Sequence, residues 1–198
     1  KDVTDCAHIL NIIAGRDEMD STSLDVQVPD FTKALVQDVK GLKIGLPKEY
    51  FVKGMDPEVE AAVKNGVKEL EKLGAEVVEM SLPNTDYAIS TYYLIAPAEA
   101  ATNLARYDGV SYGERAEDAA DLVEMMTKTR TQYLGEEVKR RIMIGNYALS
   151  AGYYDAYYLK ALKVRRLVKE DYDKAFKDVD VIICPAAPSV AYKIGEKI

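Results

Sequence analysis

The stretch that decides the fold runs from residue 135 to residue 176 and reads GEEVKRRIMIGNYALSAGYYDAYYLKALKVRRLVKEDYDKAF. Its apolar residues recur every three to four positions, which is the spacing of one face of a helix. The small residues Ser150, Ala151 and Gly152 interrupt this pattern near its middle. The stretch therefore predicts two consecutive helices joined at residues 150–152.

Three adjacent cations, Lys139, Arg140 and Arg141, lie on the first of these helices. At about 100° per residue, one narrow face of the helix carries four residues, namely Val138, Ile142, Gly145 and Leu149. Arg141 falls on the shoulder of this face, whereas Lys139 and Arg140 point away from it. Burying an unpaired charge is costly, so the Arg141 guanidinium needs an anionic partner. That partner is either a protein carboxylate or a ligand carboxylate, because arginine binds both in a bidentate manner.

The second helix also places an arginine on a predominantly apolar face. Seven residues share this face, namely Tyr154, Tyr157, Tyr158, Ala161, Val168, Tyr172 and Phe176. Arg165 lies in the middle of the face, and Arg166 lies outside it. Because a charge on a packed face requires a counter-charge, we expect Arg165 to form a structural ion pair with a nearby Asp or Glu.

The overall composition is that of a soluble globular protein of one domain or two small ones. The 198 residues are 48% hydrophobic and 30% charged, and the net charge is −7. This net negative charge argues against a basic surface that binds nucleic acid. No apolar run approaches the roughly 20 residues of a membrane span. The two cysteines, Cys6 and Cys184, lie near opposite ends, which indicates reduced thiols in a cytoplasmic protein.

A strand–helix–strand unit is predicted between residues 41 and 80. Residues 41–47 form a short strand that ends at a proline, and residues 75–80 form a second strand. Between them, Asp56 and Pro57 are suited to begin a helix as its N-cap and first residue. The two strands should be parallel, because a helix connects them. With a buried strand at residues 179–185, we predict an α/β fold that is rich in helix, with few, mostly parallel strands covered by helices.

Three more helices are predicted, at residues 4–14, 86–105 and 116–127. Pro97 lies inside the second of these and either kinks it or begins its second half. The sequence begins at Lys1 within a helical pattern and stops shortly after a strand. We therefore expect a piece of a longer protein, truncated at both ends.

The residues suited to chemistry are mainly tyrosines and arginines. The single histidine, His8, lies on a terminal helix, so a Ser–His–Asp arrangement is poorly supported. One histidine and two distant cysteines cannot form a zinc site, and no phosphate-binding glycine loop is present. Tyr92 either packs in the core with its hydroxyl hydrogen-bonded or lines a pocket beside Arg141.

Several segments together closely resemble the amidase signature family, and in particular its branch of glutamyl-tRNA(Gln) amidotransferase A subunits. The resemblance covers essentially the whole chain, residues 1–198, which would form one partial amidase domain. The segments that carry it are LKIGLPKEY at 42–50, TYYLIAPAEA at 91–100, NLARYDG at 103–109, EVKRRIM at 137–143 and SAGYYDAYY at 150–158.

The resemblance implies a glutamine-binding role for two residues of this chain. The family uses a Ser–cis-Ser–Lys catalytic triad from a Gly/Ser-rich signature, which is not among these residues. Tyr92 and Arg141 match two family contacts to glutamine, and Arg141 matches the one that meets the substrate α-carboxylate. The resemblance therefore assigns substrate binding to Tyr92 and Arg141, and it predicts that the chain alone is inactive.

The same resemblance implies the reaction of the parent protein. That protein would release ammonia from glutamine through a serine acyl-enzyme and assemble with amidotransferase subunits B and C. A partner subunit would use ATP and Mg²⁺ to convert Glu-tRNA(Gln) to Gln-tRNA(Gln), so this chain would bind no cofactor and no metal. Two alternatives remain, namely a general amide hydrolase of the same family and a helical scaffold without a ligand site.

Overall fold

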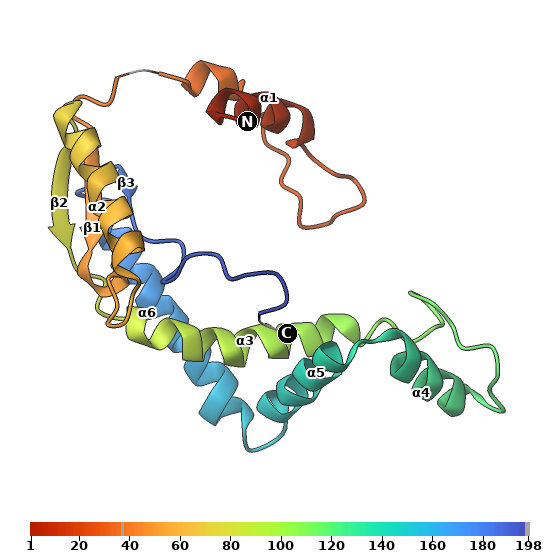
Figure 1. The fold of residues 1–198 in the computed structure, drawn as a ribbon. Coiled ribbons are helices and arrows are strands. Elements are labelled where there is room, and N and C mark those ends of the chain that lie inside the picture. The colour runs from red at the N-terminus through yellow and green to blue at the C-terminus, as the bar shows by residue number, and fades with distance from the viewer. Residues whose placement is uncertain (37, 197–198) are drawn as a thin grey trace.

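The computed structural model describes residues 1–36 and 38–196, which form a small sheet and several helices, only some of which lie beside the sheet (Figure 1). The helices are α1 Val3–Ile13, α2 Pro57–Lys72, α3 Ala88–Leu104, α4 Leu122–Tyr133, α5 Glu136–Leu149 and α6 Lys160–Ala175. The strands are β1 Lys43–Pro47, β2 Glu76–Met80 and β3 Val181–Ile182. Short helical turns are η1 Phe31–Ala34, η2 Lys48–Tyr50, η3 Thr85–Tyr87 and the π-helical η4 Tyr154–Leu159. The predicted helix-rich α/β class is confirmed.

The sheet is parallel, as predicted, with strand order β2–β1–β3. In the central strand, Ile44 pairs with Val77 on one side and with Val181 on the other, and its side chain is fully buried. The helix between β1 and β2 begins as predicted, because the Asp56 carboxylate caps it and Pro57 is its first residue. The βαβ unit that the sequence predicts is therefore present.

Helices α3 and α5 pack closely against each other. Gly145 of α5 lies so near α3 that a Cβ atom placed on it would be 2.0 Å from the carbonyl oxygen of Pro97. The same atom would be 2.8 Å from the Ala101 Cβ. Helix α3 continues through Pro97 rather than ending there. Small residues on both helices thus allow an approach that larger side chains would prevent.

Helix α6 is tied by polar contacts to the segments that follow β1 and β2. The buried Asp171 carboxylate accepts hydrogen bonds from the backbone N–H and the side-chain amide of Asn84. The Tyr172 hydroxyl shares a short hydrogen bond with the hydroxyl of Tyr50, at the end of η2. These contacts hold α6 against the loops that follow β1 and β2.

Three predicted elements differ from the structure. The helix predicted at residues 116–127 is α4, which begins at Leu122 because the Asp121 carboxylate caps the N–H of Glu124. The last strand is limited to the two residues of β3, which are exposed and half-buried rather than buried. The helix predicted at residues 4–14 is α1, whose apolar side chains Ile9, Leu10 and Ile13 are exposed, and Ala7 is the one buried residue of this helix. Figure 1 shows α1 standing apart from the sheet.

No helix in the described part of the chain combines the length and the apolar character needed to cross a membrane.

Candidate functional site

The two residues predicted to bind substrate lie next to each other on different helices. Arg141 of α5 donates a hydrogen bond from Nη1 to the Tyr92 hydroxyl of α3, with an N···O distance of 3.4 Å. The two residues are far apart in the sequence, so only the packing of α3 on α5 brings them together. The structure therefore places Tyr92 and Arg141 in one cluster, and what this cluster binds stays a prediction.

The close contact at Gly145 explains why the two side chains meet. Tyr92 comes five residues before Pro97, and Arg141 comes four residues before Gly145. Each is thus little more than one turn, of about 3.6 residues, from the point where the helices approach most closely. A long arginine side chain bridges the remaining gap. The geometry of the pair depends on the absence of a side chain at residue 145.

Glu137 also belongs to the cluster, and the sequence analysis missed it. Its Oε1 accepts a hydrogen bond from Arg141 Nε at 2.9 Å, and its other oxygen pairs with Arg140. Residues 137 and 141 are one turn apart, which is the spacing of favourable Glu-to-Arg pairs on a helix. The hydrogen bonds that Arg141 donates, first to Glu137 and then to Tyr92, raise the pKa of its guanidinium above the usual value. Arg141 is therefore a permanent cation at this position.

The Tyr93 ring forms another side of the cluster. The Arg141 guanidinium carbon lies 5.9 Å from the centre of that ring, within the range of a cation–π contact. The Tyr93 ring in turn meets Tyr92 edge-on, with ring centres 5.1 Å apart. The Arg141 side chain is 35% exposed, and Tyr92 is 52% exposed. The alternative that Tyr92 packs in the core is therefore wrong, and both side chains are partly exposed.

Arg165 of α6 lines a groove together with Tyr92. The prediction that it forms a structural ion pair is wrong for the described residues, where Arg165 is exposed and makes no salt bridge. Its neighbour Arg166 pairs with Glu170 instead, at 2.9 Å. Arg165 borders a shallow groove of about 280 Å³ between α3 and α6, lined by Ala88, Thr91, Tyr92, Ile95, Ala96, Arg165 and Val168. Tyr92 thus borders this groove together with Arg165 and also contacts Arg141.

The remaining chemically active residues do not gather at this site. His8, Cys6 and Cys184 are exposed, and both cysteines are free. Among residues 1–36 and 38–196, no three His, Cys, Asp or Glu side chains are grouped so that they could hold a metal ion. The cluster around Arg141 is suited to binding an anionic group rather than to attacking a carbonyl.

Comparisons with known proteins show the family to which the chain belongs. The Amidase family model matches residues 1–198. A curated relative, the A subunit of the glutamyl-tRNA(Gln) amidotransferase of Heliobacterium modesticaldum, is 61% identical over 197 residues, which are 100% of this chain and 40% of the relative. A second, from Geobacter metallireducens, is also 61% identical and is covered over 41% of its length. The chain thus spans about two fifths of the curated relatives it matches.

A solved structure shows the same fold. The crystal structure of the A subunit of the glutamyl-tRNA(Gln) amidotransferase from Thermotoga maritima superposes with a TM-score of 0.70 at 37% identity. The match covers 99% of this chain and 38% of that one. The similarity therefore extends through the helices that carry Tyr92 and Arg141.

Proposed function

Because this chain belongs to the amidase family, we propose that it forms part of the A subunit of a glutamyl-tRNA(Gln) amidotransferase. Curated relatives that carry this name are 57% to 61% identical to it along its whole length. In this proposal the parent subunit releases ammonia from glutamine. The present chain supplies one side of the pocket that holds the glutamine.

The proposal assigns Arg141 to the α-carboxylate of glutamine and Tyr92 to a neighbouring polar contact. The assembly would include subunits B and C and act in the cytoplasm. A partner subunit would hold ATP and Mg²⁺ and convert Glu-tRNA(Gln) to Gln-tRNA(Gln) with the released ammonia. In this division of labour, the present chain binds no cofactor.

The observation that carries the proposal is that the hydrogen-bonding capacity of the Arg141 guanidinium is only partly used. Its carboxylate partner, Glu137, lies on the same helix, so the ion pair does not join α5 to another element. The link from Arg141 to α3 is a single long hydrogen bond to Tyr92. No partner for Arg141 Nη2 is found among the described residues. A cation held in place but not saturated is suited to a carboxylate ligand, whereas a purely structural arginine would be expected to join two elements.

The chain alone should have no glutaminase activity. An acyl-enzyme needs an activated nucleophile, usually with a base within hydrogen-bond reach, and no such pair accompanies Arg141 and Tyr92 within the described residues. The purified 198-residue chain should release no ammonia from glutamine above background. Measurable turnover would contradict this part of the proposal.

Substitution of Arg141 in an intact parent protein that carries this segment, assembled with its partners, tests the assignment. Arg141→Lys keeps the charge but removes the planar donor pair. Loss of a hydrogen bond to a charged group costs about 1.5–3 kcal/mol, so KM for glutamine should rise by about 10- to 100-fold. The fall in kcat should be smaller, because the contact exists in both ground and transition states.

The control for this experiment is Arg140→Lys. Arg140 pairs with the same Glu137 carboxylate but is exposed and has no contact with Tyr92. Its substitution should leave KM for glutamine unchanged. An unchanged KM in Arg141→Lys would refute the assignment; a general hydrolase of uncharged amides and a helical scaffold both predict that result.

A further inference from the structure

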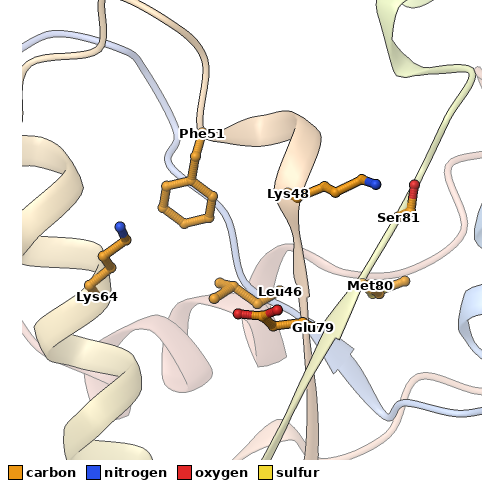
Figure 2. Close-up of a pocket in the computed structure, with 7 residues that line it drawn as sticks. All are labelled: Leu46, Lys48, Phe51, Lys64, Glu79, Met80 and Ser81. Carbon is orange, nitrogen blue, oxygen red and sulfur yellow. The ribbon is translucent and has the colours of Figure 1, made fainter.

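A second cavity, of about 470 Å³, lies at the carboxyl ends of β1 and β2 (Figure 2). It is lined by Leu46, Lys48, Phe51, Lys64, Glu79, Met80 and Ser81. None of these residues belongs to α3, α5 or α6, so the cavity is separate from the Arg141 cluster. Its volume is within the range of about 300–1,000 Å³ that is usual for small-molecule sites. Parallel α/β sheets commonly bind ligands at the carboxyl ends of their strands.

One part of the cavity is apolar. Leu46 near the end of β1 and the Phe51 ring are both half-buried. Met80 reaches the cavity from the end of β2, but its side chain lies on the other face of the sheet, next to Gly45. Figure 2 shows the Phe51 ring above Leu46, with Lys64 facing the ring from α2. Half-buried apolar side chains around an open volume can cover an apolar group of a ligand and remove it from water.

Charges of both signs line the same cavity. Lys64 is already engaged, because its Nζ pairs with Glu60 at 2.5 Å and lies 5.6 Å from the centre of the Phe51 ring. Lys48 and Glu79 make no salt bridge within the described residues. In Figure 2, Lys48 extends toward Ser81, whereas Glu79 turns toward Leu46. An ammonium and a carboxylate thus border one volume without pairing with each other.

The carboxylate nearest to Lys48 in sequence is used elsewhere. Glu49 accepts hydrogen bonds from the Ser81 hydroxyl and from the Leu82 N–H, the latter at 2.9 Å. These bonds turn the Glu49 carboxylate toward the start of the loop after β2. Because the Ser81 hydroxyl donates to Glu49, its oxygen remains available only as an acceptor.

We propose that this cavity binds a small zwitterion, namely an α-amino acid with an apolar side chain. Lys48 meets the carboxylate, Glu79 meets the ammonium group, and Leu46 and Phe51 cover the side chain. A purely anionic ligand would face the Glu79 carboxylate, and a purely cationic one would face two lysines. A ligand that carries both charges matches the lining better than either.

The probe is L-phenylalanine, titrated into the ¹⁵N-labelled 198-residue chain and followed by two-dimensional NMR. Two analogues each lack one charge: L-phenylalaninamide has no carboxylate, and N-acetyl-L-phenylalanine has no ammonium group. We expect L-phenylalanine to bind in the millimolar range and to shift signals of residues 46–51 and 79–81. Each analogue should bind about tenfold more weakly, the effect of roughly 1.4 kcal/mol.

Two variants connect each ligand charge to one side chain. Lys48→Ala should weaken L-phenylalanine binding about tenfold, so that L-phenylalanine binds no more tightly than L-phenylalaninamide. In this variant L-phenylalanine should still bind more tightly than N-acetyl-L-phenylalanine. Glu79→Gln should produce the opposite pattern. The control variants Lys53→Ala and Glu71→Gln, at exposed positions outside the cavity lining, should bind like the parent chain.

Three results would overturn the proposal. The first is the absence of saturable shifts with L-phenylalanine. The second is equal binding of the three compounds, which would indicate an apolar pocket only. The third is a variant, either Lys48→Ala or Glu79→Gln, in which the preference for L-phenylalanine falls equally relative to both analogues. Unchanged signals outside the cavity would show that each variant is folded.

Discussion

Replacement of Gly145 by alanine tests the contact on which the Arg141 cluster depends. The new methyl group would lie 2.0 Å from the Pro97 carbonyl oxygen and 2.8 Å from the Ala101 Cβ. The first of these partners is a backbone atom inside a helix and cannot rotate away as a side chain would. Either α5 or α3 has to move.

The size of the displacement follows from ordinary contact distances. The methyl group needs about 1.4 Å more room, which is the difference between a van der Waals contact of 3.4 Å and the 2.0 Å observed. Overpacking of this kind costs about 1–3 kcal/mol, and the upper end applies here because a backbone atom is involved. Alanine regains about 1 kcal/mol through its higher helix propensity. The net loss in free energy of unfolding should be about 2 kcal/mol.

The same displacement should also separate Arg141 from Tyr92. Their hydrogen bond is already 3.4 Å long. An extra ångström would place the two atoms beyond the range in which a hydrogen bond forms. In an intact amidotransferase, Gly145→Ala should therefore raise KM for glutamine although residue 145 itself does not touch the proposed ligand.

Urea unfolding followed by circular dichroism measures the stability change, and Gly66→Ala is the matched control. Gly66 is also a helical glycine, on α2, but a Cβ there would meet nothing within 4 Å. That substitution should stabilise the chain by about 0.5–1 kcal/mol. If Gly145→Ala stabilised the chain to the same extent, the close approach of α3 and α5 would be refuted.

Three further predictions concern the polar contacts around α6 and the sheet. Burial, followed by the hydrogen bond with Tyr50, raises the pKa of Tyr172 above its usual 10.0; the unfolded chain then loses this proton first, so stability should fall above about pH 10, and Tyr172→Phe should reduce that fall in urea titrations. Partial burial acts to raise the pKa of Glu49, but its hydrogen bonds outweigh this and lower the pKa below 4.5. The resulting stabilisation is present above the pKa that Glu49 has in the unfolded chain and is lost as the pH falls through its pKa in the folded chain. Glu49→Gln should therefore make acid unfolding less steep. Asp171→Asn would set an amide against the two N–H donors of Asn84 and should cost about 2 kcal/mol at neutral pH, measured by urea unfolding.

Local sequence patterns were sufficient for the βαβ unit. Asp56 and Pro57 identify the start of α2 because an N-cap carboxylate and an N-terminal proline act within one turn. The parallel pairing of β1 with β2 follows from the helix that joins them. Each of these features depends on residues that are close in sequence, so each is readable without knowledge of the packing.

The start of α4 was missed although a local signal exists. Asp121 and Glu124 have the spacing of an N-cap and its third helical residue, and the Asp121 carboxylate does bind the Glu124 N–H. The alanines at 116, 119 and 120 favour a helix by propensity, yet the helix begins only after Asp121. Capping chemistry outweighed propensity at this boundary.

The site was only partly predictable. Helical spacing distinguishes Arg141 from Arg140 because it gives the direction of a side chain around its own axis. It says nothing about the neighbouring helix, so the approach of Gly145 to Pro97 and the ring of Tyr93 could not be found in this way. The same limitation explains the error at Arg165, which faces a groove rather than a carboxylate.

The polarity of the hydrogen bond at the site supports an anionic ligand. Arg141 has no acceptor atom, so the Tyr92 oxygen accepts and the Tyr92 proton remains to be donated. The cluster then presents donors from both residues toward solvent, with the one carboxylate, Glu137, engaged by two arginines. A carboxylate ligand would accept from the guanidinium and the hydroxyl together, whereas an ammonium group would have to compete with two arginines for the Glu137 carboxylate. Tyr92→Phe should therefore weaken glutamine binding through loss of a donor, measured as a higher KM in the intact enzyme, while leaving the Arg141–Glu137 pair intact.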